Sequence, residues 1–240
     1  MSKREYVGLW KKTRGKTVTG TDWTQVKMNC LGDSTVWGDD GMGGGGPQIS
    51  WVAQITAYLP FQTVRNYGVN GSRVVLSADK QDSFVERYAQ MEADADIITV
   101  LGGVNDFQHD VPLGSLQATD LHTFRGALHY LLTGLLEKYP DKQVLFMTPM
   151  QNDFVYPGGE YPNSFQKNRI GLTQTDYVKT MQEACARYSV PVLDLYRSSG
   201  ISPFIAAQAE QYMPDKMHYN AKGYRRLAKR IATYLSQLIV

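Results

Sequence analysis

The sequence has few cysteines, little net charge and no long apolar run. Its 240 residues include two cysteines, Cys30 and Cys185, which are too few for a disulfide framework or a cysteine-rich metal site. Both lie in stretches that we expect to be buried, so we interpret them as small core side chains rather than functional thiols. The formal net charge is +2, and so small a charge does not indicate binding to nucleic acid or to an anionic membrane.

Signals for export or membrane insertion are also lacking. No stretch approaches the ~18 apolar residues that a membrane span needs, and no apolar segment of a secretory signal follows the charged residues 1–5. We therefore expect no membrane span and a cytoplasmic location. Residues 1–24 are polar and basic, and we interpret them as an N-terminal arm before a single domain at 25–240. A solvated lead-in explains the arm better than an anion-binding segment does.

Strand-like and helix-like stretches alternate along the rest of the chain. Helical spacing of apolar residues predicts a helix that begins at Pro47, which suits the first helical position, and a long final helix over 224–238. Further helices are predicted around 82–91, 121–135 and 173–188. Apolar or β-rich runs predict strands at residues 26–31, 95–101, 142–147 and 190–195, and a second short strand is predicted at 61–66, closed by the turn residues 66–71.

This alternation predicts an α/β fold in which helices cover both faces of a parallel sheet. We expect a doubly wound, flavodoxin-like sheet of about five strands in the order 2-1-3-4-5, by analogy with similar folds. In that order the first and third strands are neighbours. The crevice outside their carboxyl ends is where sheets of this kind bind ligands.

The stretch Gly32-Asp33-Ser34 follows the first predicted strand directly. An apolar run that stops at Gly-Asp-Ser predicts a buried strand that ends in a tight turn, which glycine permits. The turn would lift the hydroxyl of Ser34 above the carboxyl end of the strand. A serine at that place is a candidate nucleophile if the chain also supplies a base, an orienting acid and an oxyanion hole.

Three further polar segments are expected at the same edge of the sheet. They are residues 66–71 after the second strand, residues 103–106 after the third, and residues 215–218 before the final helix. Each has an ordinary interpretation, since asparagine and glycine are common in turns, Asn105 can cap backbone groups, and Asp215 can cap the last helix. Their combined order and placement favour a catalytic interpretation.

Each of these residue types suits one role in acyl transfer. Ser34 needs a base to become a good nucleophile, and His218 titrates near neutrality. Asp215 lies three residues earlier and can accept a hydrogen bond from the far ring nitrogen of that histidine, which fixes the tautomer. The candidate oxyanion donors are the backbone N–H groups of Ser34 and Gly71 and the side-chain amide of Asn105.

Other features have simpler explanations. The glycine run at 41–46 lacks the Gly-Lys-Ser/Thr ending of a phosphate loop, so we interpret it as a flexible surface loop. His122 and His129 are expected seven residues apart on one helix, with structural roles. His109 follows Asn105 closely and can line the pocket. The long loop at 150–171 is rich in aromatic residues, and such loops are often functional.

Together the polar segments resemble the motifs of the SGNH hydrolases, also called GDSL-type esterases and lipases. Gly32-Asp33-Ser34 resembles the first motif of the family and residues 66–71 resemble the second. Residues 103–106 match Gly-x-Asn-Asp, and residues 215–218 match Asp-x-x-His. The resemblance extends from about residue 26 to the end of the chain.

The resemblance implies a three-layer α/β/α fold and a two-step reaction through an acyl-serine, with no metal and no cofactor. It implies that Ser34 is the nucleophile, His218 the base, Asp215 its orienting acid, and Gly71 and Asn105 oxyanion donors. The second motif is the loosest match, so Gly68 is an alternative donor to Gly71.

Two positions depart from the family pattern. Thr35 replaces the leucine of the first motif, and Tyr219 follows the histidine where many members have proline. Neither touches a catalytic atom, so we expect both to affect local packing more than activity.

We therefore expect a serine-dependent hydrolase of small-molecule or carbohydrate esters. The aromatic loop favours a small acyl group such as acetyl on a sugar, because aromatic rings stack on sugar rings. One alternative is an acyltransferase or thioesterase that uses the same residues. Another is a glycan-binding module that keeps the fold without turnover.

Overall fold

A computed structural model describes residues 20–154 and 161–238, so most of the expected N-terminal arm and residues 155–160 of the long loop lie outside the described residues. Five strands form one sheet in which every neighbouring pair is parallel, in the order β2-β1-β3-β4-β5. This confirms the predicted α/β class and strand order. The strands are β1 (Lys27–Gly32), β2 (Thr63–Gly68), β3 (Ile97–Leu101), β4 (Gln143–Met147) and β5 (Val192–Leu193).

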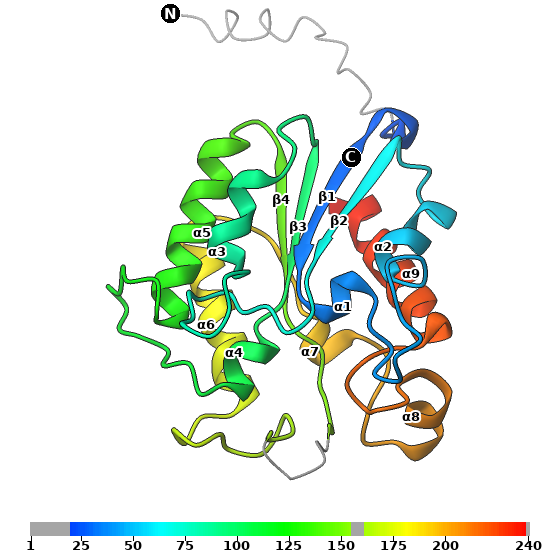
Figure 1. Ribbon diagram of the computed structural model, residues 1–240. Coiled ribbons are helices and arrows are strands. Elements are labelled where there is room, and N and C mark those ends of the chain that lie inside the picture. The colour runs from blue at the N-terminus through cyan, green and yellow to red at the C-terminus, as the bar shows by residue number, and fades with distance from the viewer. Residues whose placement is uncertain (1–19, 155–160, 239–240) are drawn as a thin grey trace, which may run out of the picture.

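Helices follow the strands along the chain and cover both faces of the sheet. They are α1 (Ser34–Trp37), α2 (Trp51–Gln54), α3 (Phe84–Arg87), α4 (Val104–Gln108), α5 (Phe124–Lys138), α6 (Gln174–Arg187), α7 (Leu195–Ser198), α8 (Ala206–Tyr212) and α9 (Ala221–Leu238). Figure 1 shows α3, α5 and α6 on one side of the sheet and α2 and α9 on the other. Across the two described ranges, no helix combines the length and the apolar character that crossing a membrane requires.

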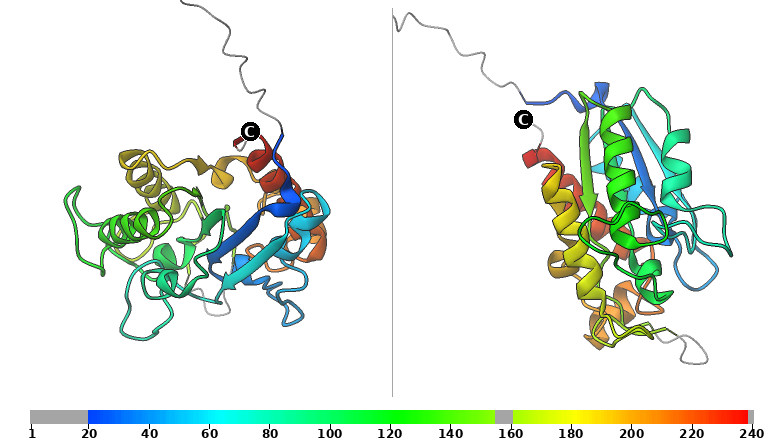
Figure 2. Two further views of the ribbon diagram at one scale, coloured as in Figure 1. Left: turned by 90° about the horizontal axis from the view of Figure 1, so that it is seen from above. Right: turned by 90° about the vertical axis from the view of Figure 1, so that its left-hand side faces the viewer.

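Two hydrophobic cores fill the spaces between these three layers. Because successive strand residues point to opposite faces, Ile98 and Val100 of β3 pack in the core under α5 and α6. Ile97 and Leu101 pack in the core under α2 and α9. The views in Figure 2 show the same sandwich from two other directions. A strand that is apolar on both faces therefore lies at the centre of the sheet, as the continuous run at 95–101 indicates.

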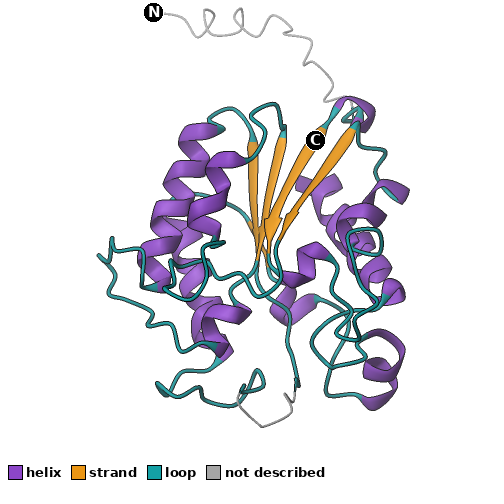
Figure 3. Cartoon of the chain, viewed as in Figure 1, coloured by secondary structure: helices purple, strands orange, loops and turns teal. Residues whose placement is uncertain are grey.

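The strand register brings three strand ends to one level. Gly32 at the end of β1 pairs with Gly68 of β2 on one side and with Leu101 of β3 on the other. The arrowheads in Figure 3 all point toward the same edge of the sheet, where the loops after the strands gather. The segments that follow β1, β2 and β3 are therefore neighbours at this edge.

The expected helix start at Pro47 is wrong. Residues 47–49 form a turn, and α2 begins at Trp51. The Ser50 hydroxyl accepts hydrogen bonds from the backbone N–H groups of Val52 and Ala53, at 3.1 and 3.3 Å. A serine that caps the helix in this way sets its first turn, and the proline preference is only a weaker competing signal.

The placement of His122 and His129 on one helix is also wrong. α5 begins at Phe124 and carries His129, whereas His122 lies in the preceding turn. There the Asp120 carboxylate accepts hydrogen bonds from the backbone N–H groups of His122 and Thr123, at 3.0 and 2.8 Å. This aspartate gives the backbone an alternative to an earlier helical turn.

We expect Gly32→Ala to destabilise the fold. A methyl group at residue 32 would lie 2.1 Å from Val36 Cγ2 and 2.6 Å from the Leu101 carbonyl oxygen, so β1, α1 and β3 would have to separate. Overpacking of this kind costs about 1–3 kcal/mol of unfolding free energy, measurable by urea denaturation. The control is Gly20→Ala, because no atom lies within 4 Å of its added methyl group. Equal stability of the two variants would contradict the close approach at Gly32.

Candidate active site

Ser34 is the first residue of α1 and lies directly beyond the end of β1. Asp33 precedes the helix, and its carboxylate accepts hydrogen bonds from the backbone N–H and the hydroxyl of Thr35, at 3.0 and 2.7 Å. These bonds fix the turn that the Gly-Asp-Ser pattern predicts. The Ser34 residue is only 4% exposed, so a ligand must enter a cavity to reach its hydroxyl.

Ser34, His218 and Asp215 form one hydrogen-bonded chain across 184 residues of sequence. The Ser34 Oγ lies 2.9 Å from His218 Nε2, and His218 Nδ1 lies 2.6 Å from Asp215 Oδ2. The other carboxylate oxygen of Asp215 accepts hydrogen bonds from the backbone N–H groups of Met217 and His218, at 2.9 and 2.7 Å. The short loop before α9 therefore holds the imidazole at a fixed angle, with one ring nitrogen toward the serine.

The electrostatic environment favours a protonated imidazole next to an ionised carboxylate. Burial alone would lower the pKa of His218, but the hydrogen bond to Asp215 and its negative charge raise this pKa above the ordinary value. Burial would likewise raise the pKa of Asp215, but the hydrogen bond and charge of His218 lower it. An imidazolium that forms during a reaction is therefore stabilised by Asp215.

Gly71 and Asn105 lie beside Ser34 and line the same cavity. Gly71 follows β2 in a turn with a φ of +71°, a conformation that favours glycine. Asn105 is the second residue of α4, and its Nδ2 donates to the carbonyl oxygen of Ser72 at 3.0 Å. A side-chain amide has two N–H bonds, so the second is available to a ligand.

Gly68 is less well placed than Gly71. Its backbone N–H donates to Asn66 Oδ1 at 2.8 Å, and it does not line the cavity. A methyl group at residue 68 would lie 2.1 Å from the Trp37 backbone nitrogen. Glycine is therefore required there because β2 packs closely against α1. Of the two alternatives left open by the sequence, the geometry therefore favours Gly71.

The cavity above these groups has a volume of about 200 Å³. His109 lines it and packs edge-to-face against Tyr161, with ring centroids 5.4 Å apart. Phe154 forms another wall, and its ring centroid lies 6.5 Å from that of His218. The described parts of the 150–171 loop thus contribute aromatic side chains to the site, whereas Phe165 is exposed and packs against Phe204.

Asp106 is important for the site, although the sequence reasoning gave it no role. Its buried carboxylate accepts hydrogen bonds from the backbone N–H of Val74 at 3.0 and 3.1 Å and from that of Val75 at 3.2 Å. Burial raises the pKa of Asp106 to about 7. Because Asp106 is adjacent to Asn105 in α4, these bonds fix the segment after Gly71 relative to the Asn105 amide.

Arg87 was also missed, and it ties the ends of β1 and β2 together. Its guanidinium donates to the carbonyl oxygens of Gly32 at 3.0 Å and Tyr67 at 2.5 Å, and to the Ser72 hydroxyl at 2.9 Å. An arginine can join three separate segments because its donors point in several fixed directions. Local patterns could not reveal this role, since Gly32, Tyr67 and Ser72 lie 55, 20 and 15 residues away in the sequence.

Gln108 lines the cavity one helical turn beyond Asn105. Its side chain is buried, and its Nε2 has no hydrogen-bond partner among the residues that the structure describes. A buried donor left unpaired is costly, so this group is suited to bind a polar atom of a ligand. In the sequence, the available signal for Gln108 was its position three residues after Asn105, a spacing that places two side chains on the same face of a helix.

The remaining expectations concern metals and the two departures from the family pattern. No group of three or more His, Cys, Asp or Glu side chains within 20–154 and 161–238 is arranged to hold a metal ion. Thr35 bonds Asp33 as described above, and Tyr219 is fully buried, with its ring centroid 5.6 Å from that of Tyr224. Both departures therefore have structural consequences outside the Ser34–His218–Asp215 chain.

A parallel sheet that holds a linked Ser, His and Asp at its carboxyl edge has the site geometry of the serine hydrolases. The model of the GDSL-like Lipase/Acylhydrolase family matches residues 30–226. The chain belongs to this family of acylhydrolases.

Solved structures agree with this assignment. One crystal structure is 46% identical over 92% of this chain and 100% of its own, with a TM-score of 0.88. A protein from Lactobacillus plantarum is 32% identical over 90% of this chain and 99% of its own, with a TM-score of 0.78. A carbohydrate acetylesterase family member from Sinorhizobium meliloti shares the fold at 15% identity, with a TM-score of 0.62, 89% of this chain and 99% of its own covered. A comparison with curated proteins found no match.

Proposed function

We propose that this protein is a serine esterase that cleaves carboxylic esters through an acyl-serine intermediate. The observation that carries the proposal is the linked geometry of Ser34, His218 and Asp215, with distances of 2.9 and 2.6 Å. A serine hydroxyl in direct contact with a histidine, which is itself oriented by a carboxylate, is the arrangement that activates serine as a nucleophile.

In the first step, Ser34 Oγ attacks the ester carbonyl carbon and its proton moves to His218 Nε2. The carbonyl oxygen becomes an oxyanion, which the backbone N–H groups of Ser34 and Gly71 and the amide of Asn105 stabilise. Each such donor contributes about 3–4 kcal/mol to the barrier reduction in comparable sites. The tetrahedral intermediate then expels the alcohol, which takes the proton from His218 and leaves the acyl group on Ser34.

In the second step, water attacks the acyl-serine and gives its proton to His218. Collapse of this second intermediate breaks the bond to Ser34, which recovers a proton from His218, and the carboxylic acid leaves. Asp215 stays ionised throughout and stabilises the imidazolium in both steps.

The cavity favours small acyl groups. Its volume of about 200 Å³ lies below the ~300–1,000 Å³ of typical ligand pockets. Phe154 and Tyr161 give it aromatic walls, which suit stacking on a sugar ring. We therefore propose short acyl esters, with acetyl groups on carbohydrates as the leading natural class. The carbohydrate acetylesterase family member among the fold relatives is consistent with this choice.

Chain-length selectivity tests this proposal directly. We expect turnover of p-nitrophenyl acetate and of acetylated sugars by the wild type, with kcat/KM falling as the acyl chain lengthens from two to eight carbons. Turnover that rises with chain length would contradict the small-acyl assignment. Product analysis with added alcohols separates hydrolysis from the alternative of acyl transfer, because a transferase would form the new ester in place of the free acid.

A non-catalytic glycan-binding module is the second candidate, and the aromatic walls of the cavity favour it. It requires glycan binding that Ser34→Ala does not change, together with no turnover by the wild type. The contact between Ser34 and His218 favours the esterase instead, since binding alone does not need an activated serine.

Substitution of Gln108 should weaken substrate binding. Because Gln108 lines the cavity and its buried Nε2 has no hydrogen-bond partner among the described residues, we expect Gln108→Ala to raise KM about 2–10-fold with a smaller change in kcat, the effect of one lost neutral hydrogen bond. Steady-state kinetics with p-nitrophenyl acetate measure both constants. Gln90→Ala, at an exposed glutamine in the segment after α3, is the matched control. Identical kinetics in the two variants would contradict this role.

A further inference from the structure

The C-terminal helix α9 carries a cluster of exposed cations with no acidic residue among them. No acidic residue occurs after Asp215, whereas α9 carries five cations in nine positions. The apolar side of α9, which includes Tyr224, Leu227 and Ile231, is buried in the hydrophobic core. This apolar side is therefore not free to insert into a membrane. The exposed cations are Lys222, Arg225, Arg226, Lys229 and Arg230.

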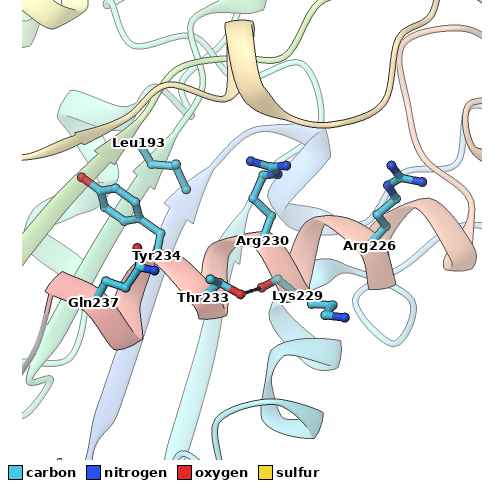
Figure 4. A pocket seen from close by; sticks show the side chains of 7 residues that line it. All are labelled: Leu193, Arg226, Lys229, Arg230, Thr233, Tyr234 and Gln237. Atoms are coloured by element: carbon cyan, nitrogen blue, oxygen red, sulfur yellow. Dashed lines mark hydrogen bonds between the residues drawn. The ribbon is translucent and has the colours of Figure 1, made fainter.

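A groove lies beside this helix, away from Ser34. Its volume is about 360 Å³, and it runs between α9 and β5, the edge strand of the sheet. None of its lining residues lines the cavity above Ser34. Figure 4 shows the lining side chains, which are Leu193, Arg226, Lys229, Arg230, Thr233, Tyr234 and Gln237.

Arg226 and Arg230 both line this groove. They leave α9 on the same side, whereas Lys229 points in another direction (Figure 4). A side-chain carbon added to Gly200, just after α7, would lie 3.2 Å from Arg230 Nη2 and 3.8 Å from Arg226 Nη2. Both guanidinium groups therefore reach the same small region of space.

This pair of charges has no carboxylate to balance it. Within the described ranges, no Asp or Glu oxygen lies within 4.0 Å of Arg226, Lys229 or Arg230. Arg226 packs over the ring of Tyr212, with its Cζ 5.4 Å from the ring centroid. Two like charges held together without a counter-charge repel each other, and a bound dianion would relieve that repulsion.

The other end of the groove has a different character. Leu193 and the ring of Tyr234 lie side by side there (Figure 4), and the Tyr234 hydroxyl donates to the Val192 carbonyl oxygen at 3.5 Å. Thr233 and Gln237 add neutral polar groups, with Thr233 on the side of the arginines and Gln237 beside Tyr234 (Figure 4). The groove thus has two guanidinium groups at one end and an apolar surface at the other.

We propose that this groove binds an organic phosphate monoester, with its phosphate on Arg226 and Arg230 and its apolar or aromatic body against Leu193 and Tyr234. A monoester carries close to two negative charges and three terminal oxygens, which match two guanidinium forks better than a single carboxylate does. The same chemistry is present in a free metabolite and in the phosphomonoester headgroup of a lipid. The proposal does not depend on the reaction at Ser34.

Phenyl phosphate and inorganic phosphate are the probes for calorimetric titration at constant ionic strength. We expect phenyl phosphate to bind more tightly than inorganic phosphate, because only it has a body for the apolar wall. The double variant Arg226→Gln/Arg230→Gln should weaken this binding at least tenfold, since charge-assisted hydrogen bonds are lost. The matched control is Lys222→Gln/Arg225→Gln, which removes two charges from the same helix outside the groove. Arg225 donates to Gln54 on α2, and neither residue lines the groove.

Sedimentation with phosphatidylcholine vesicles, with or without phosphatidic acid, separates the two sources of the ligand. Binding of the soluble probe assigns a free metabolite. Binding only to vesicles with phosphatidic acid, lost in Arg226→Gln/Arg230→Gln, assigns a lipid headgroup. Binding of neither probe nor vesicle, or equal losses in the two double variants at unchanged thermal stability, would overturn the proposal. Phenyl phosphate that binds no more tightly than inorganic phosphate would overturn the organic ligand.

Discussion

Ser34→Ala should lower kcat for p-nitrophenyl acetate by about 10⁴-fold or more, because removal of the nucleophile from a linked serine site removes nearly all of its catalytic advantage. The loss should appear in kcat, with little change in KM, since the hydroxyl forms its new bond only during the reaction. Steady-state rates measured against a buffer blank give both constants.

Two controls separate this effect from misfolding. Ser236→Ala removes an exposed hydroxyl from α9 and should leave turnover unchanged, as this hydroxyl donates to the Thr233 carbonyl oxygen of its own helix and does not line the cavity. The thermal stability of Ser34→Ala should equal that of the wild type. If the Ser34→Ala variant hydrolyses the ester as fast as the wild type, the esterase proposal fails.

Asp215→Asn should lower kcat by about 10³–10⁴-fold, the range seen when the orienting carboxylate of a serine site is replaced. Asparagine keeps the size of the side chain but removes its charge, so His218 loses the group that fixes its tautomer. In this structure the same carboxylate also holds its own loop through two backbone N–H groups, and the amide can keep only part of that support.

The pH profile of the same variant gives a second result with a definite sign. Only neutral His218 can accept the proton of Ser34, so kcat/KM rises with pH as the imidazole loses its proton. Asp215 raises the pKa of His218, so the wild-type rise should be centred above ~6.5, the ordinary histidine value. Without that charge the pKa of His218 should fall, because burial lowers it and only the charges of Asp39 and Asp33 still raise it. The rise in Asp215→Asn should therefore move to lower pH than in the wild type.

The control for this shift is Asp153→Asn. Asp153 pairs with Lys216 at 2.7 Å, beside the same loop, but makes no hydrogen bond to His218. Removing it should leave the midpoint nearly unchanged. A wild-type profile that is flat from pH 5 to 8, or an identical midpoint in Asp215→Asn, would contradict the assignment of His218 as the base.

The strand pattern could be predicted because most strands contain apolar or β-branched residues and are bounded by turn residues. The central strand β3 is buried at every position and apolar at all but Thr99, as burial on both faces favours. Strand ends shifted by one or two residues, since β2 runs from Thr63 to Gly68 rather than over 61–66. Glycine and tyrosine can continue a strand when its neighbour supplies hydrogen bonds, and the sequence does not show that neighbour.

The four polar segments were found because catalytic groups at a sheet edge come in short local patterns. Asp215 and His218 are three residues apart, and Asp33 and Thr35 complete one capped turn with Ser34. Such contacts lie within a few residues, where sequence spacing is informative. The roles of these residues in catalysis remain predictions for the experiments above.

The residues that support the site could not be predicted, because their hydrogen-bond partners are distant in the sequence. Asp106 bonds Val74 and Val75, more than thirty residues earlier, and Arg87 bonds Gly32 across 55 residues. Nothing near either residue in the sequence signals these contacts. The errors at Pro47 and His122 have another origin, because a nearby serine or aspartate competed for the same backbone groups.

Covalent labelling of the wild type with a fluorophosphonate probe, followed by mass spectrometry of the digested protein, tests the central claim most directly. A probe of this kind phosphonylates an activated serine, so we expect one adduct on the peptide that contains Ser34 and none in the Ser34→Ala variant. A folded protein that hydrolyses esters but carries the adduct on another residue, or no adduct at all, would contradict the role of Ser34 as nucleophile.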